Sequence, residues 1–240
     1  MITTTKETIT LPPLGSLKEY NFVTAAERSD KLFSNLETLV AGSEEKITQA
    51  AEKFRADTKR SLEGVSVESE KLSHHAGANR AVLIRREEAA ATEPTRQEII
   101  QELQALAAEA EIMAPIFVSP KQMLLRLTLG EAKRSEYLRQ LEGVNQDELN
   151  AYAAHCVGTK DLQLASALCQ IVGPLPKDQR PGFTADELAM IFIGSQYEAV
   201  QRAREVIARN PPMAIDIDRA YRTGQKQSVA SSLTRAARLQ

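Results

Sequence analysis

The stretch FTADELAMIFIGSQYEAVQRAREVIARN, from Phe183 to Asn210, decides the fold that we expect. Thr184 followed three residues later by Glu187 is a capping box, which predicts the start of a helix. Asn210 is followed by two prolines, which predict the end of that helix. Residues 188–193 leave no polar face, and a helix that is apolar all round is buried all round. We therefore predict the central helix of a helical domain, with its first half in the core.

The second half of this stretch predicts a one-sided helix. Its apolar residues recur at helical spacing, and its arginines fall on the opposite side. The apolar set is Val200, Ala203, Val206 and Ile207, and the basic set is Arg202, Arg204 and Arg209.

The same stretch resembles a helix-turn-helix DNA reader. A Thr, a Glu-Leu-Ala segment, a glycine and then basic residues follow one another in the order of that family. In the family pattern the alanine precedes the turn glycine by four positions, whereas Ala189 and Gly194 are five apart. That difference rotates the second helix by about 100°. A continuous buried helix accounts for the same residues without this error.

The composition predicts an all-helical protein. The chain is rich in alanine, has 11 glycines and no tryptophan, and shows few runs that alternate with the period of a strand. A formal net charge of −2 with 26% charged residues is typical of a soluble protein. No apolar run approaches the ~18–20 residues of a membrane span, and no signal-peptide core begins the chain. We expect a cytoplasmic protein, or a virion component if the chain is phage-encoded.

The chain divides into four predicted regions. Residues 1–15 are rich in threonine and end near a Pro-Pro pair, which predicts an extended arm. Residues 16–93 predict long polar or amphipathic helices, with breaks at Gly42 and Gly64 and apolar stripes thin enough to need a partner helix, as in a coiled coil. Residues 94–212 predict a compact antiparallel helical bundle with short connections. Residues 213–240 form a basic tail.

Capping signals divide the predicted bundle into helices. Thr95 with Glu98 predicts one start, and Pro115 its end or kink. Ser119, followed by a proline and Gln122, predicts a second helix that runs to Gly143. Further starts are predicted at Asn145, with Glu148 as its box partner, after the Gly158-Thr159 break, and at Thr184.

Motifs for catalysis, metal binding or cofactor binding are missing from the sequence. Cys156 and Cys169 have no partner at metal-ligand spacing, and both are expected to be structural. The sequence contains no phosphate loop, no nucleophile elbow and no HExxH motif. We therefore expect no catalytic residue, metal or cofactor. An enzyme remains an alternative, and its minimum requirement is a pocket that brings His155 or Cys156 against a carboxylate.

The C-terminal tail carries the candidate contacts with nucleic acid. After Asp218 the sequence has no acidic residue, and its positive charges suit phosphate groups. These candidates are Arg219, Arg222, Lys226, Arg235 and Arg238. The candidate assembly contacts are the apolar and proline residues of the arm and the tail leucines, namely Leu11, Pro12, Pro13, Leu14, Leu233 and Leu239.

Together these patterns favour a non-enzymatic structural or assembly protein. The expected partners are copies of the chain or neighbouring subunits of a large homo- or hetero-oligomeric particle. By analogy with particles built from helical bodies and extended arms, the specific prediction is a bacteriophage virion component. The alternative is a nucleic-acid-binding or regulatory protein that uses the helix at 184–209 and the basic tail.

Overall fold

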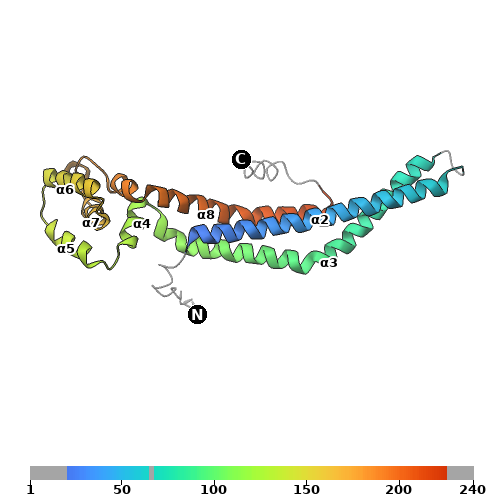
Figure 1. Ribbon diagram of the computed structural model, residues 1–240, viewed down its shortest axis with the longest axis horizontal. Helices are drawn as coiled ribbons and strands as arrows, with labels where there is room; N and C mark the ends of the chain where they lie inside the picture. The colour runs from blue at the N-terminus through green and yellow to red at the C-terminus, as the bar shows by residue number, and fades with distance from the viewer. Residues whose placement is uncertain (1–20, 65–67, 226–240) are drawn as a thin grey trace, which may run out of the picture. The chain divides into compact units, whose positions relative to one another are not determined.

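The computed structural model describes residues 21–64 and 68–225. Every regular element in these residues is a helix, as predicted: seven α-helices, α2 to α8, and two short 3-10 helices (Figure 1). The predicted arm at 1–15 lies outside the described residues, and so does the predicted tail (213–240) from residue 226 onward; the first part of that tail, residues 213–223, belongs to α8 instead. In the part of the chain that the structure describes, no helix combines the length and the apolar character needed to cross a membrane.

The chain forms two compact units, each built from two separate stretches. Within the described residues, the long-helix unit comprises residues 24–64, 68–108 and 205–225, and the short-helix unit comprises residues 21–23 and 109–204. The boundaries predicted at residues 94 and 212 do not coincide with this division, which falls between residues 108 and 109 in α3 and between residues 204 and 205 in α8.

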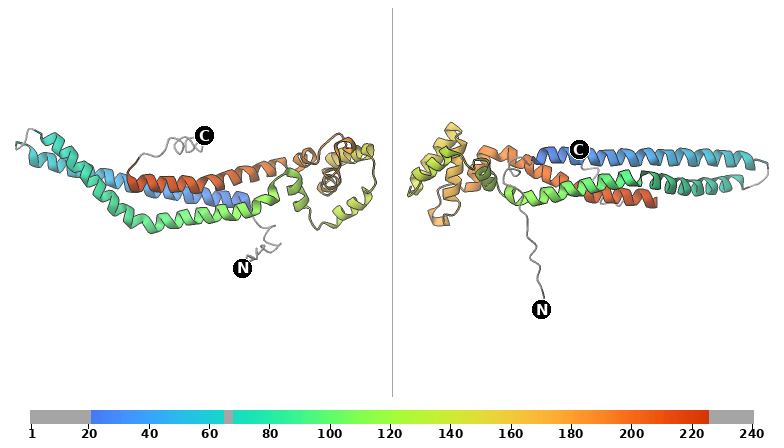
Figure 2. Two further views of the ribbon diagram at one scale, coloured as in Figure 1. Left: turned by 180° about the vertical axis from the view of Figure 1, so that it is seen from behind. Right: turned by 90° about the horizontal axis from the view of Figure 1, so that it is seen from below.

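Three helices make up the long-helix unit: most of α2 (Phe22–Leu62), most of α3 (Ser69–Met113) and the end of α8 (Ala185–Thr223). Within this unit they lie side by side in both views of Figure 2. Their shared core is a cluster of aromatic, aliphatic and methionine side chains: Phe33, Leu36, Ile100, Leu103, Met213, Ala214 and Ile217.

The break predicted at Gly42 is wrong, because α2 passes through it. A glycine inside a helix costs only about 1 kcal/mol relative to alanine, which the packing of a 41-residue helix outweighs. The start predicted at Thr95 is also wrong, since α3 runs through Pro94. Pro94 is exposed, so water can bind the backbone carbonyl that its ring leaves without a partner.

The end predicted at Asn210 is wrong as well, because α8 continues through Pro211 and Pro212 to Thr223. A proline inside a helix costs about 3 kcal/mol. The residues beyond the prolines offset this cost, because Met213, Ala214 and Ile217 are buried in the core of the long-helix unit.

The short-helix unit contains four short helices and the first part of α8. They are α4 (Pro120–Leu127), α5 (Ala132–Gln140), α6 (Gln146–Thr159) and α7 (Leu162–Val172), with 3-10 helices at Ala114–Phe117 and Lys177–Gln179. Their core contains Leu124, Leu141, Leu149, Leu164, Leu168, Leu188 and Ile193.

The predicted caps of this unit are confirmed. The side chain of Ser119 accepts a hydrogen bond from the backbone of Gln122, and Asn145 and Glu148 form a complete capping box. At the start of α8, the Thr184 hydroxyl accepts from the Glu187 N–H. One boundary differs: the helix predicted from Ser119 to Gly143 is two helices, separated near Gly130, whose φ of 86° favours glycine.

The first half of α8 is only partly buried. Leu188, Ala189 and Ile193 face the core, as predicted. Met190 and Ile191 are 37% and 63% exposed, so the prediction that they lie in the core is wrong. The helix packs on the short-helix unit with one face, and apolar side chains on its other side stay in contact with solvent.

A buried charged cluster and an uncovered helical hairpin

A buried ion pair joins α3 to α8 in the long-helix unit. The guanidinium of Arg96 meets the carboxylate of Asp218, and their side chains are 0% and 3% exposed. Arg96 also donates to the Thr92 hydroxyl at 3.1 Å and to the carbonyl oxygen of Ala89 at 2.6 Å. The second carboxylate oxygen of Asp218 lies 2.9 Å from Nε of Arg222. Burial lowers the pKa of Arg96, whose positive charge is compensated by this carboxylate.

Tyr221 links this pair to α2. Its ring lies 5.1 Å from the guanidinium carbon of Arg96 and 5.9 Å from that of Arg85. Arg85 donates to the Tyr221 carbonyl oxygen at 3.0 Å and to the Glu44 carboxylate at 2.8 Å. The hydrogen bond with Glu44 raises the pKa of Arg85. Charged hydrogen bonds and cation–π contacts therefore connect all three helices at one level.

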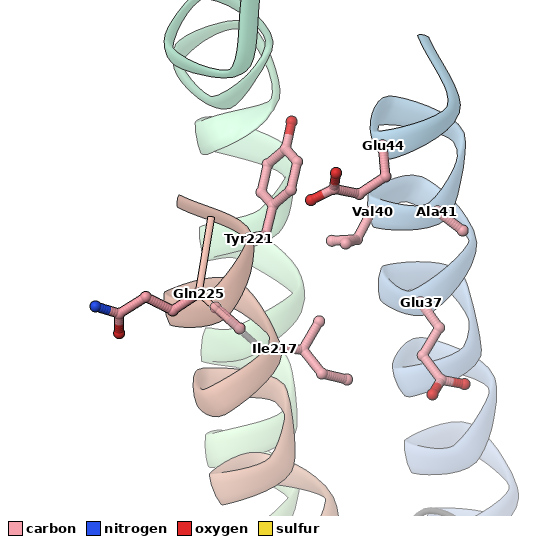
Figure 3. A pocket seen from close by; sticks show the side chains of 8 residues that line it. Glu37, Val40, Ala41, Glu44, Ile217, Tyr221 and Gln225 are labelled. Carbon is pink, nitrogen blue, oxygen red and sulfur yellow. The ribbon is translucent and has the colours of Figure 1, made fainter. Parts of the chain in front are cut away.

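A pocket of about 270 Å³ lies beside this cluster, between α2 and the end of α8 (Figure 3). Carboxylates line its α2 side, and Tyr221 with aliphatic side chains lines the other. The lining residues are Glu37, Val40, Ala41, Glu44, Ile217, Ala220, Tyr221 and Gln225. Glu44 lines this pocket, but its carboxylate already binds Arg85. This carboxylate therefore serves the contact between α2 and α3.

The structure places two of the five predicted phosphate contacts. Arg219 lies 3.9 Å from the Asp216 carboxylate, and Arg222 pairs with Asp218. Both arginines therefore face an acid on their own helix. The other candidates lie outside the described residues: Lys226, Arg235 and Arg238, together with the assembly candidates Leu11, Pro12, Pro13, Leu14, Leu233 and Leu239.

The two cysteines are core residues of the short-helix unit. Both are fully buried, and burial raises the pKa of Cys156 to about 11 and that of Cys169 to about 12. Each thiol therefore stays protonated at neutral pH, and only a thiolate is a nucleophile or a metal ligand. Among the described residues, no group of three or more potential ligands could hold a metal ion.

His155 does share a hollow with a carboxylate. It lines a concavity of about 440 Å³ together with Glu148, one of whose oxygens accepts a hydrogen bond from the Asn145 backbone at 3.1 Å. The carboxylate of Glu148 thus serves the capping box of α6. The hollow therefore brings His155 near a carboxylate, as the enzyme alternative requires, but the carboxylate of Glu148 already serves as a helix cap.

The uncovered hairpin, residues 48–62 of α2 and 69–83 of α3, is the second candidate site. It extends beyond the end of α8, so only two helices lie side by side there (Figure 1). Within it only Ser73 and Gly77 are buried. A Cβ atom at Gly77 would lie 3.1 Å from Cβ of Arg55 and 3.3 Å from the Ala51 carbonyl oxygen, so the two backbones approach closely.

Large apolar side chains of the uncovered hairpin stay half exposed instead of being buried between its two helices. Between 43% and 52% of their surface is exposed, and they are Phe54, Leu72, Val82 and Leu83. The sequence shows that the apolar stripes of these two helices are thin. It does not show that small residues lie where the two helices touch. The pairing of Ser73 and Gly77 at helical spacing is the signal that sequence reasoning missed.

These elements define an all-helical protein with a long-helix unit and a short-helix unit. Comparisons with protein-family models, with curated proteins and with solved structures found no match to this chain. The functional argument therefore rests on the residues described above.

Proposed function

We propose that this protein is a non-enzymatic structural component that assembles with protein partners into an oligomeric particle. The observation that carries the proposal is the uncovered hairpin, which keeps large apolar side chains outside while small residues fill its seam. Such an arrangement suits helices that complete their packing against another chain.

The energetics of the uncovered hairpin support this proposal. Most helical stability in proteins comes from packing an apolar face, and this segment buries only Ser73 and Gly77. Full burial of a Leu, Val or Phe side chain contributes about 1.5–3 kcal/mol. Half-exposed Phe54, Leu72, Val82 and Leu83 therefore retain a substantial part of that free energy for a partner.

The finer form of the proposal has three parts. The long helices pair with partner helices in a coiled-coil-like manner, and the short-helix unit forms the compact body. The arm at 1–15 and the basic tail, predicted at 213–240 with Leu233 and Leu239 as contacts, bind neighbouring subunits. A bacteriophage virion component remains the specific version, by analogy alone.

The nucleic-acid alternative gains no specific support from the described residues. Its two described cations, Arg219 and Arg222, pair with Asp216 and Asp218. The stretch that resembles a helix-turn-helix reader is one continuous helix through Gly194.

Light scattering of the full-length protein tests the proposal, over a range of concentrations and at low and high salt. We expect an oligomer that persists at high salt, because apolar contacts do not weaken as exposed ion pairs do. Amide exchange within the uncovered hairpin should slow as the concentration rises. A chain that stays monomeric throughout, with uniformly fast exchange in this segment, would contradict the proposal.

A further inference from the structure

We propose that residues 226–240 bind back on their own chain at their start, with the Lys226 side chain in the pocket between α2 and α8 and its ammonium on the Glu37 carboxylate. This contact goes beyond the proposed assembly function and does not depend on it. It would fix the direction in which the basic tail leaves the long-helix unit.

The end of α8 places residue 226 at the pocket. Gly224 has a φ of 68°, the left-handed conformation that commonly follows the last turn of a helix. Its N–H donates to the Tyr221 carbonyl oxygen at 3.4 Å, which fixes the path of the chain there. Gln225 then lines the pocket, so the Cα atom of Lys226 follows at about 3.8 Å from that of a lining residue.

The lining of the pocket matches the chemistry of a lysine side chain. Val40, Ile217 and Ala220 provide apolar surface, and the carboxylates of Glu37 and Glu44 belong to its α2 side (Figure 3). A lysine buries its methylene groups along apolar surface and keeps its ammonium at a polar edge. The pocket, with a volume of about 270 Å³, accommodates one such side chain.

Glu37 is the carboxylate that we assign to the ammonium. Glu44 already accepts a hydrogen bond from Arg85 at 2.8 Å, which holds α2 and α3 together. Glu37 precedes Glu44 by seven residues, so it lies on the same side of α2 about two turns away. A carboxylate has about four acceptor positions, so Glu37 can bind an ammonium in addition to its other contacts.

Charge directs residues 226–240 to this part of the molecule. They contain three basic residues and no acidic one. The three-helix part of the long-helix unit, residues 24–47, 84–108 and 205–225, contains 13 acidic and nine basic side chains, a formal net charge of −4. The uncovered hairpin has six basic and three acidic side chains, a formal net charge of +3. Attraction to the three-helix part and repulsion from the hairpin therefore act in the same direction.

The direct connection favours the chain's own pocket over that of a neighbour. Because Lys226 is joined to Gln225, its effective concentration at the pocket is about millimolar or higher, well above that of the same residue on another molecule. The contact uses only the start of the segment. Leu233 and Leu239 follow seven and 13 residues later, and they remain available for neighbouring subunits.

Carbodiimide cross-linking of the full-length protein tests the contact, because this reagent joins a lysine only to a carboxylate that touches it. We would mix unlabelled and ¹⁵N-labelled protein in equal amounts, cross-link at low salt and identify the linked peptides by mass spectrometry. We expect a link between Lys226 and Glu37 within one chain, so that both linked peptides carry the same isotope. Lys46 and Glu88, whose charged groups lie 3.6 Å apart, are the positive control.

The reactivity of Lys226 provides a second readout. Acetylating reagents react with the neutral amine, and a carboxylate that holds the ammonium lowers the neutral fraction. We expect E37Q to speed the acetylation of Lys226 by about fivefold. The matched variant E45Q should leave the rate unchanged, because Glu45 is exposed on α2 and does not line the pocket. Circular dichroism should show the same helix content in both variants.

The outcomes separate this inference from the proposed assembly. Links from Lys226 that join peptides of different isotopes would overturn the contact within one chain and support assembly. The absence of a link from Lys226 to Glu37, in a sample where Lys46 is joined to Glu88, would overturn the inference, and so would equal acetylation rates in wild type and E37Q. A protein that is monomeric under every condition, with the expected link inside each chain, would uphold the inference and contradict assembly.

Discussion

Arg96 of α3 and Asp218 of α8 form an ion pair whose two side chains are almost entirely excluded from water. Removing one partner of such a pair leaves an uncompensated buried charge. We expect D218N to lower the free energy of unfolding by about 3–5 kcal/mol. The double variant R96M/D218L should lose much less, because neither charge remains in the core. Urea unfolding followed by circular dichroism measures both, and equal losses for the single and double variants would contradict this account.

Replacing Pro212 should stabilise the long-helix unit. Pro212 is exposed inside α8, so its substitution removes little packing. P212A restores a backbone N–H and relieves the clash of the proline ring with the preceding turn. We expect the free energy of unfolding to rise by about 1–3 kcal/mol. Pro211 is buried, so P211A serves as the comparison. Its free energy of unfolding should rise less than that of P212A, because the substitution also removes packed ring atoms.

Asp161 should make the short-helix unit sensitive to acid. It is the N-cap of α7, and its carboxylate accepts from Tyr137 and Lys133 at 2.8 Å. Burial raises the pKa of Asp161, but the hydrogen bonds from Lys133, the Leu164 backbone and Tyr137 together lower it. Because the pKa in the folded state lies below that in the unfolded state, the stabilisation is complete above about pH 4 and is lost as the pH falls further.

D161N isolates this contribution, because asparagine is an equally good N-cap. We expect wild type to be more stable than D161N at pH 7, and the difference to shrink below about pH 4. Thermal unfolding at several pH values measures it. A difference that stays constant between pH 7 and pH 3 would show that the charge of Asp161 is not responsible.

Gly77 should tolerate substitution far less well than Gly42, although both lie within long helices. A Cβ at Gly77 would meet Arg55 and Ala51 of α2, whereas nothing lies within 4 Å of the corresponding position at Gly42. G77V should therefore destabilise the long-helix unit by about 1–3 kcal/mol through overpacking. G42A should stabilise it by about 1 kcal/mol, the difference in helix propensity. Equal effects in denaturant titrations would mean that α2 and α3 do not approach closely at Gly77.

The cysteine thiols should resist modification in the native state. Cys156 and Cys169 are buried, and the pKa of each is well above neutral pH. At pH 8 we expect a thiol reagent such as DTNB to label neither residue until denaturant is added, when both should react. Rapid labelling of one thiol in the native protein would restore interest in the enzyme alternative near His155.

Local signals predicted several helix starts correctly, but they failed for the start at Thr95 and for the end at Asn210. The caps at Ser119, Asn145 and Thr184 were predictable, because the groups that satisfy the first backbone N–H groups lie within three residues. Pro94 and Pro211 misled the prediction because the outcome at a proline depends on how the residues beyond it pack. That packing involves helices far away in the sequence, such as α2 with Phe33 and α8 with Met213.

The charged cluster was beyond sequence reasoning for the same reason. Arg96 and Asp218 are 122 residues apart, and neither belongs to a motif. In the sequence Asp218 is the last acid before a run of basic residues, whereas in the structure it pairs with both Arg96 and Arg222. In contrast, the thin apolar stripes of the uncovered hairpin can be read from the sequence. They depend on the spacing of residues within each helix and not on contacts with a distant part of the chain.

The interleaved order of the two units has a consequence for synthesis on the ribosome. α2 and most of α3 emerge first, but residues 205–223, which complete their core, follow only after the whole stretch from 109 to 204 has been translated. At about 5–20 residues per second this delay is on the order of 5–20 s. During that interval Phe33, Leu36 and Leu103 lack the α8 side chains that cover them in the finished protein. During this interval the nascent long helices expose more apolar surface than in the finished protein, so this is the stage of synthesis at which a chaperone has the most to protect.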